Sequence, residues 1–122
     1  MNVQKRITDE ETKELQKYIL DILLAIDKVC REHNLTYYLI AGTMLGAVRH
    51  KGFVPWDDDA DVALPRKDYN ILVKHANEWL PKRYELVSGL QDPMYPYQFA
   101  RIQDRETTYI LRRRFNFVGG LP

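Results

Sequence analysis

The sequence predicts an α/β domain, because helical and strand patterns alternate along its 122 residues. Two segments carry apolar residues at helical spacing, and the segments between and after them are rich in β-branched and aromatic residues. A third observation is a run of aspartates directly before an apolar stretch, which places charged side chains at a strand. With 45% hydrophobic and 29% charged residues, the chain is typical of one globular domain over residues 1–122.

Composition excludes several classes of function. The formal net charge of +1 argues against a dedicated nucleic-acid binder, which is usually strongly basic. The single cysteine, Cys30, excludes an internal disulfide and a cysteine-rich zinc site. Asp21 interrupts the longest apolar stretch, and the N-terminus lacks a signal pattern, so we expect no transmembrane segment and a cytoplasmic protein without a nucleic-acid partner.

The first predicted element is a long helix. Thr8 and Glu11 have the spacing of a capping box, with Thr8 as N-cap, and the helix is expected to run to about His33. One apolar face at helical spacing predicts that it packs on the core. This face consists of Leu15, Ile19, Ile22, Leu23, Ile26, Val29 and Cys30.

A strand and a short helix follow. The run from Leu35 to Ala41 is β-rich, and we expect a strand over residues 37–40. Gly42 and Thr43 break this run, and a helical pattern continues through Val48. A basic loop over residues 49–52 then leads to Trp56 and the aspartates.

The remaining segments complete the alternation. Pro65 lies where a helix would start, Pro81 ends it, and residues 66–80 carry an apolar stripe of Tyr69, Leu72, Val73, Ala76 and Leu80. Residues 84–88 are predicted as a strand and residues 89–96 as a loop. Residues 97–103 alternate as a strand does, with a turn at 104–106 and a returning strand at 107–111.

Four aspartates stand within five positions, at 57, 58, 59 and 61. Such closely spaced like charges repel one another unless a cation lies among them. In an extended strand over residues 59–62, Asp59 and Asp61 would share one face, with Cα atoms about 7 Å apart. Their oxygens favour Mg²⁺ or Mn²⁺ over Zn²⁺, so we predict Asp59 and Asp61 as metal ligands and catalytic residues.

Upstream residues supply a predicted phosphate site. Gly42 allows close approach of the backbone, and a helix that opens at Thr43 would direct free N–H groups at an anion. Arg49 and Lys51 either neutralise a pyrophosphate or balance the negative charge of the neighbouring aspartates. The sequence favours neither interpretation over the other.

Other residues near this segment have two interpretations each. Trp56 stacks on a nucleobase or covers the core beneath the loop, with core packing slightly favoured. Asp57 and Asp58 cap the strand or orient the ligands, and structural support is favoured for Asp58. Arg101 reaches a ligand phosphate or is solvated.

The segment from Gly42 to Val62 resembles the defining segment of the LicD family. Its sequence is Gly-Thr-Met-Leu-Gly-Ala-Val-Arg-His-Lys-Gly-Phe-Val-Pro-Trp-Asp-Asp-Asp-Ala-Asp-Val. The family includes bacterial phosphocholine transferases and is related to the fukutin-type transferases. The resemblance implies a nucleotidyltransferase-like mixed sheet flanked by helices, in which a Gly-Ser/Thr turn and an Asp-x-Asp strand bind metal and nucleotide phosphates.

The resemblance also implies a reaction. A phospho-alcohol such as phosphocholine moves, with Mg²⁺ or Mn²⁺, from a CDP-activated donor such as CDP-choline to a sugar hydroxyl. The glycan acceptor would be a cell-surface glycan or a lipopolysaccharide or teichoic acid precursor. Two alternatives stay open: a nucleotidyltransferase that acts on a small molecule or protein, and a non-catalytic domain.

The family pattern continues into a strand with a third carboxylate, which this chain does not contain before Pro122. We therefore expect an N-terminal fragment of a longer protein. Without that strand, one sheet edge near the aspartates is expected to be unpaired or to recruit a neighbouring chain.

Overall fold

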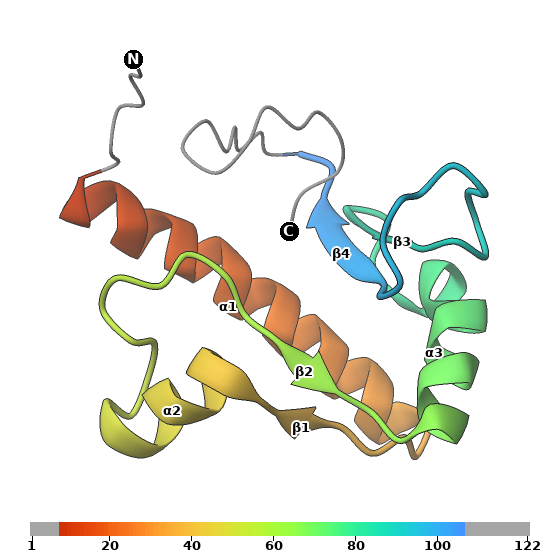
Figure 1. Cartoon of the computed structure of the whole chain (residues 1–122), viewed down its shortest axis with the longest axis horizontal. Helices are drawn as coiled ribbons and strands as arrows, with labels where there is room; N and C mark the ends of the chain where they lie inside the picture. Colours follow the sequence, from red (N-terminus) through yellow and green to blue (C-terminus); the bar gives the residue numbers. More distant parts are fainter. Residues whose placement is uncertain (1–7, 107–122) are drawn as a thin grey trace.

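The computed structural model describes residues 8–106 and confirms the α/β class (Figure 1). Helices and strands alternate as the sequence predicts. In chain order they are α1 (Asp9–Glu32), β1 (Tyr38–Leu39), α2 (Ala41–Arg49), β2 (Val62–Ala63), α3 (Arg66–Trp79), β3 (Tyr84–Val87) and β4 (Arg101–Asp104).

The strands form two small antiparallel sheets among the described residues, where we had expected one mixed sheet. In the first sheet Tyr38 pairs with Ala63 and Leu39 with Val62. In the second, β3 pairs along its whole length with β4, from Tyr84 opposite Asp104 to Val87 opposite Arg101. The returning strand predicted at 107–111 lies outside the described residues. Whether a sheet edge recruits another chain stays a prediction.

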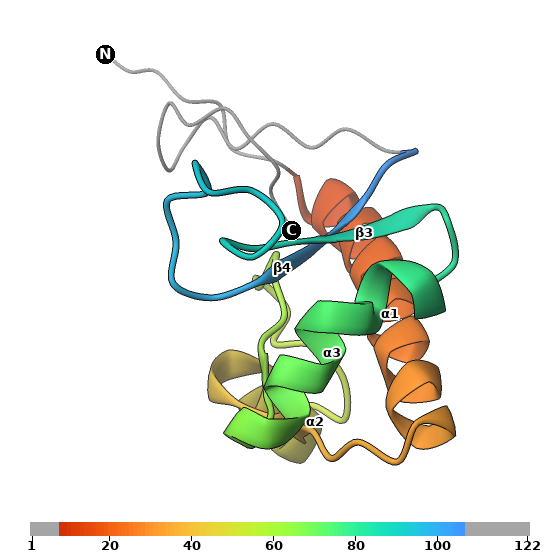
Figure 2. The same cartoon turned by 90° about the vertical axis from the view of Figure 1, so that its right-hand side faces the viewer.

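The long helix α1 runs diagonally across the molecule, past both sheets and α3 (Figures 1 and 2). Its capping box is confirmed: Glu11 N donates to Thr8 Oγ1 at 3.0 Å, and Thr8 N donates to Glu11 Oε1 at 2.7 Å. Near the other end, Asp27 accepts hydrogen bonds from Arg31 and Tyr37, both at 2.8 Å. The bond from Arg31, and then that from Tyr37, holds the pKa of the Asp27 carboxyl below its ordinary value.

The core lies between α1, α3 and the β3–β4 sheet. Both predicted helical faces point into it: Val29 from α1, and Leu72, Val73 and Ala76 from α3, are buried together with Leu86 of β3. Ala100 and Ile102 pack against this cluster from the β4 side. No helix among residues 8–106 is long and apolar enough to cross a bilayer.

Candidate functional site

The segment that carries the predicted site residues forms a unit of its own, β1–α2–loop–β2 (Figure 1). β1 leads directly into α2, and the loop over residues 50–61 returns the chain to β2, which pairs with β1. The start of α2 and the segment before β2 therefore lie side by side. Residues about twenty positions apart in the sequence meet at this junction.

The hydroxyl of Thr43 makes the central contact of the junction. Asp61 N donates to Thr43 Oγ1 at 2.7 Å, and Ile40 N donates to Asp61 O at 3.2 Å. Thr43 is buried in the first turn of α2. These two bonds fix the backbone of Asp61 beside the N-terminus of the helix.

The strand predicted over residues 59–62 is shorter in the structure. β2 begins at Val62, so Asp59 and Asp61 lie in the irregular segment that precedes it. The physical reason is the length of its partner: β1 ends at Leu39 because α2 starts at Ala41, which leaves little backbone for β2 to pair with. The argument that strand alternation puts both carboxylates on one face is therefore wrong. Their roles as catalytic residues and metal ligands stay predictions.

The two glycines of α2 allow the returning loop to pack directly against the helix. A Cβ atom at Gly42 would lie 2.7 Å from Oδ2 of Asp57, and one at Gly46 would lie 2.4 Å from the carbonyl oxygen of Gly52. Neither glycine has a positive φ, so the requirement is for space. We predicted that Gly42 opens space for a ligand phosphate; in the structure the carboxylate of Asp57 is its close neighbour.

Gln16 of α1 holds the loop from the other side, and nothing in the sequence distinguished it. Its Nε2 lies 2.7 Å from the carbonyl oxygen of Asp57, 3.3 Å from that of Val54 and 3.4 Å from that of Pro55. One amide group thus faces three carbonyl oxygens within four residues of an irregular segment. A backbone carbonyl group in a loop needs a hydrogen-bond donor from the protein when it is buried away from water.

Two residues with left-handed backbone conformation flank α2. Ala41 has φ 52° at the first position of the helix, and Lys51 has φ 54° just after its end. This conformation costs roughly 1–2 kcal/mol for a residue with a Cβ atom. Strain of this kind persists where surrounding contacts enforce it. The hydrogen bond to Thr43 and the packing at Gly46 are contacts that can hold Ala41 and Lys51 in this conformation.

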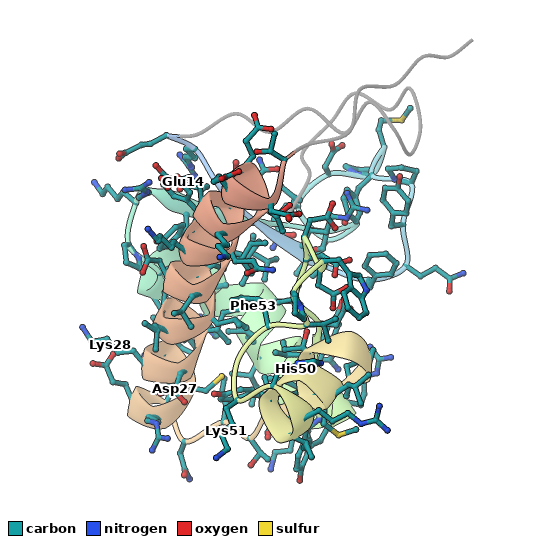
Figure 3. All side chains as sticks on the ribbon, turned by 90° about the vertical axis from the view of Figure 1, so that its left-hand side faces the viewer. Glu14, Asp27, Lys28, His50, Lys51 and Phe53 are labelled. Atoms are coloured by element: carbon teal, nitrogen blue, oxygen red, sulfur yellow. The ribbon has the colours of Figure 1, made fainter. Side chains whose placement is uncertain are left out.

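The predicted cations lie at the opposite end of α2 from Thr43. Arg49 and Lys51 are exposed, and neither forms an ion pair with a residue in the range 8–106. Figure 3 shows Lys51 and His50 in the loop that follows the helix. The interpretation that both cations balance the aspartates through direct contact therefore finds no support, and their phosphate role stays a prediction.

Trp56 and Arg101 have different surroundings. The Trp56 side chain is 75% exposed, so the expectation that it packs on the core is wrong. Arg101 lies on β4, in the other sheet, with its guanidinium carbon 4.4 Å from the ring centre of Tyr97. Asp58 is buried, as its structural-support interpretation requires. Binding of a donor molecule by Trp56 or Arg101 stays a prediction.

The chemistry of the carboxylates fits a Mg²⁺ or Mn²⁺ ion that substrate phosphates also coordinate. Such ions need only one or two protein carboxylates in addition to phosphate oxygens and water. Asp61 is exposed and Asp59 is half-buried at the junction. Within residues 8–106, no three His, Cys, Asp or Glu side chains are close enough together to hold a metal without such help.

Comparison with known proteins places this junction within one family. Residues 34–117 match the family described as LicD/FKTN/FKRP, nucleotidyltransferase domain. Among curated proteins, lipopolysaccharide cholinephosphotransferase LicD of Haemophilus influenzae is 40% identical over 73 residues, which are 60% of this chain and 26% of that protein.

Two further relatives come from Rickettsia. An uncharacterized protein of Rickettsia typhi is 36% identical over 64 residues, 52% of this chain and 20% of its own length. One of Rickettsia prowazekii is 46% identical over 37 residues, 30% of this chain and 14% of its own length. The chain thus spans about a quarter or less of each of these relatives. No solved structure is significantly similar to it.

Proposed function

Since the chain belongs to the LicD/FKTN/FKRP nucleotidyltransferase-domain family, we propose that it serves metal-dependent transfer of a phospho-alcohol from a CDP-activated donor to a sugar hydroxyl. Phosphocholine from CDP-choline is the first candidate, because the Haemophilus influenzae relative is named a lipopolysaccharide cholinephosphotransferase. The proposed glycan acceptor is a lipopolysaccharide or teichoic acid precursor, in the cytoplasm.

The observation that carries this proposal is the bond from Asp61 N to Thr43 Oγ1 at 2.7 Å. It joins the N-terminus of α2, where backbone N–H groups favour an anion, to the segment that bears Asp59 and Asp61. A donor pyrophosphate at this junction would meet helix N–H groups on one side and carboxylate-held cations on the other. This is the electrostatic arrangement that phosphoryl transfer requires.

In the proposed reaction, the sugar hydroxyl oxygen attacks the phosphorus that carries choline, and the bond from this phosphorus to the bridging oxygen breaks. A phosphodiester forms and CMP leaves with the bridging oxygen. We assign acceptance of the hydroxyl proton to Asp59 or Asp61. A bound Mg²⁺ or Mn²⁺, held by Asp59 and Asp61, would supply neutralisation of the pyrophosphate charge.

The remaining predicted residues have supporting roles in this proposal. We assign Gly42 and Thr43 to phosphate oxygens through the start of α2, which requires the Asp57 carboxylate beside Gly42 to move or to share a cation with the phosphate. Arg49 or Lys51 offsets charge as it develops. Trp56, whose ring is exposed, is available to stack on the cytosine base. The guanidinium group of Arg101 lies over the ring of Tyr97, and we assign it to binding a phosphate of the donor.

Two alternatives have their own supporting observations. The family description names a nucleotidyltransferase domain, which favours transfer of the nucleotide itself. The lack of a third clustered ligand among residues 8–106 favours a non-catalytic domain. Product analysis distinguishes them: phospho-alcohol transfer from CDP-choline releases CMP, nucleotide transfer releases pyrophosphate from CTP or phosphocholine from CDP-choline, and a non-catalytic domain releases none of these.

Ligand-induced stabilisation tests the site without requiring turnover. A ligand that binds only the folded state at a hundredfold excess over Kd stabilises it by about 2.7 kcal/mol. We expect Mn²⁺ with CDP-choline to raise the melting temperature by several degrees. Asp59→Asn and Asp61→Asn should each abolish this rise. Asp21→Asn, which removes an exposed carboxylate from α1, should retain it.

The outcome that contradicts the proposal is specific. If the rise persists in both Asp59→Asn and Asp61→Asn, the metal and nucleotide bind elsewhere, and the assignment of these carboxylates is wrong. If it persists only in Asp21→Asn but incubation with CDP-choline and an acceptor transfers CMP and releases phosphocholine, the site is correct and the nucleotidyltransferase alternative replaces the proposed reaction.

A further inference from the structure

The outward face of α2 is apolar, which is the reverse of an ordinary surface helix. Met44, Leu45 and Val48 are all exposed, and Val48 reaches 74%. Spacings of three and four residues bring these side chains onto one face of the helix. Ala41, at the same face one turn before Leu45, is exposed as well.

The glycines explain why the large side chains point outward. Thr43 and Gly46 are the buried residues of α2, and at Gly46 the loop backbone approaches to a distance that excludes a Cβ atom. Only small residues fit between the helix and the loop. In α1 and α3 the buried residues are mostly large aliphatic ones, such as Ile26, Val29 and Leu72. α2 therefore buries its small residues and presents its large ones.

The charged side chains of α2 and of the residues directly after it are all cationic. From Ile40 to Trp56 the sequence contains Arg49, His50 and Lys51 and not one aspartate or glutamate, although the chain has 17 acidic residues. Arg49 follows Leu45 by one helical turn, so it borders the apolar face. The loop that packs against the helix also presents Trp56, which is 75% exposed.

The aspartates after Trp56 that contact α2 do so on its other side. Asp57 places an oxygen against Gly42, which lies on the opposite side of the helix from Met44 and Val48, and Asp58 is buried. The backbone of Asp61 is bonded to Thr43, also on the buried side. An apolar helical face bordered by a cation, followed by a loop with a second cation and an exposed tryptophan, is the pattern of a helix that lies in the interface of an anionic membrane.

We propose that the outward face of α2 docks on an anionic lipid surface, with Met44, Leu45 and Val48 among the acyl chains and Arg49 and Lys51 at the headgroups. A second copy of this chain is a weaker fit. A nine-residue helix is about 13–14 Å long. One face of so short a helix is too small to bury the roughly 800 Å² per partner that a stable dimer needs. Lipid docking leaves the Thr43–Asp61 junction on the far side of the helix, but it assigns Arg49, Lys51 and Trp56 to the lipid in place of the roles that the proposed reaction gives them. This inference does not depend on the proposed reaction.

Vesicle co-sedimentation tests the proposal. We expect the protein to bind vesicles of phosphatidylglycerol and phosphatidylcholine in equal parts, and to bind pure phosphatidylcholine vesicles much less. Val48→Glu should weaken binding at least about tenfold, because it places a charge among acyl chains. Arg49→Glu combined with Lys51→Glu should remove the preference for anionic vesicles, as should high salt.

A matched control separates this face from general hydrophobicity. Leu24 of α1 is 57% exposed, and Leu24→Glu should leave vesicle binding unchanged. Tryptophan fluorescence gives a second measurement, since Trp56 is one of two tryptophans. Anionic vesicles should shift the emission of the unmodified chain to the blue, and Trp56→Phe should remove that shift.

Three results would overturn the proposal. The first is equal binding to anionic and neutral vesicles, or none to either. The second is a loss in Leu24→Glu as large as in Val48→Glu. The third is a concentration-dependent dimer that Val48→Glu converts to a monomer without any vesicle binding, which would assign the face to a second copy of the chain.

Discussion

In the region formed by α3, β3 and β4, large apolar side chains make the decisive contacts, whereas in the β1–α2–β2 region these contacts are made by backbone, glycine and a hydroxyl group. Leu72, Ala76 and Leu86 are buried in the first region. In the second, Thr43 and Gly46 are buried while Met44 and Val48 face outward. Both regions contain one helix and two strands, so the difference lies in what each helix packs against.

Polar contacts also differ between the two regions. In the first, Arg83 makes a bidentate pair with Asp104, with bonds of 2.8–3.0 Å, and joins the start of β3 to the end of β4. The hydrogen bond with the Asp104 carboxylate raises the pKa of Arg83. In the second, Gln16 donates to a backbone carbonyl of an irregular loop, and the Thr43 hydroxyl accepts from the backbone amide of Asp61.

The difference indicates that the two regions serve different purposes. A region stabilised by apolar burial tolerates changes at its surface, because its stability depends on the interior. A region stabilised by backbone contacts fixes the path of a loop precisely and leaves its side chains available for ligands and surfaces. The Asp59–Asp61 segment and the apolar face of α2 both belong to the second kind.

The largest predicted effect removes apolar burial from the first region. Leu86→Ala, at a side chain that is 2% exposed, should lower the free energy of unfolding by about 2–5 kcal/mol. Urea denaturation followed by circular dichroism measures it. Leu90, 68% exposed in the following loop, is the matched control, and Leu90→Ala should change stability by less than about 0.5 kcal/mol. Equal effects at both positions would mean that β3 is not part of the core.

A smaller effect is expected from filling the glycine contact of the second region. Gly46→Ala forces a Cβ atom against the backbone at Gly52 and Val54, which no side-chain rotation relieves. We expect a loss of about 1–3 kcal/mol, in spite of the helix propensity that alanine adds. Gly89→Ala, where nothing lies within 4 Å of the new atom, is the control and should be close to neutral. A neutral Gly46→Ala would show that the loop does not pack on α2.

The smallest effect on stability is expected at Thr43, but it is the most informative for the site. Thr43→Val removes the acceptor of the bond from Asp61 N and should cost about 1–2 kcal/mol. Thr12→Val is a matched control, because Thr12 is also buried and its hydroxyl donates to Thr8 O at 3.0 Å. Both variants should lose similar stability.

Only Thr43→Val should also abolish the rise in melting temperature that Mn²⁺ and CDP-choline produce. The reason is that it releases the segment that carries the carboxylates from the start of α2. If Thr43→Val retains that rise in full, the junction between Thr43 and Asp61 is structural and the nucleotide binds elsewhere.

Local sequence patterns determined the elements of this chain well. The capping box at Thr8 and Glu11 and the helical faces of α1 and α3 depend on contacts within one helix or on simple apolar periodicity. The break at Gly42 and Thr43 and the aspartates that follow were sufficient to predict that these two segments meet, as the bond from Asp61 N to Thr43 Oγ1 confirms, while a binding site at this junction stays a prediction. The cap and the helical faces can be predicted from the sequence because residues three and four positions apart are neighbours in a helix.

The tertiary structure alone decided how the segments meet. Gln16 is a plain helical residue in the sequence, and its three carbonyl neighbours lie 38–41 positions away. The outward face of α2 follows from the close packing at Gly46, which depends on the path of the returning loop, and the same path leaves Trp56 exposed. β2 is short because its partner β1 turns into α2 after two residues. Periodicity reports which side of an element is apolar, but contacts between distant segments determine what that side faces.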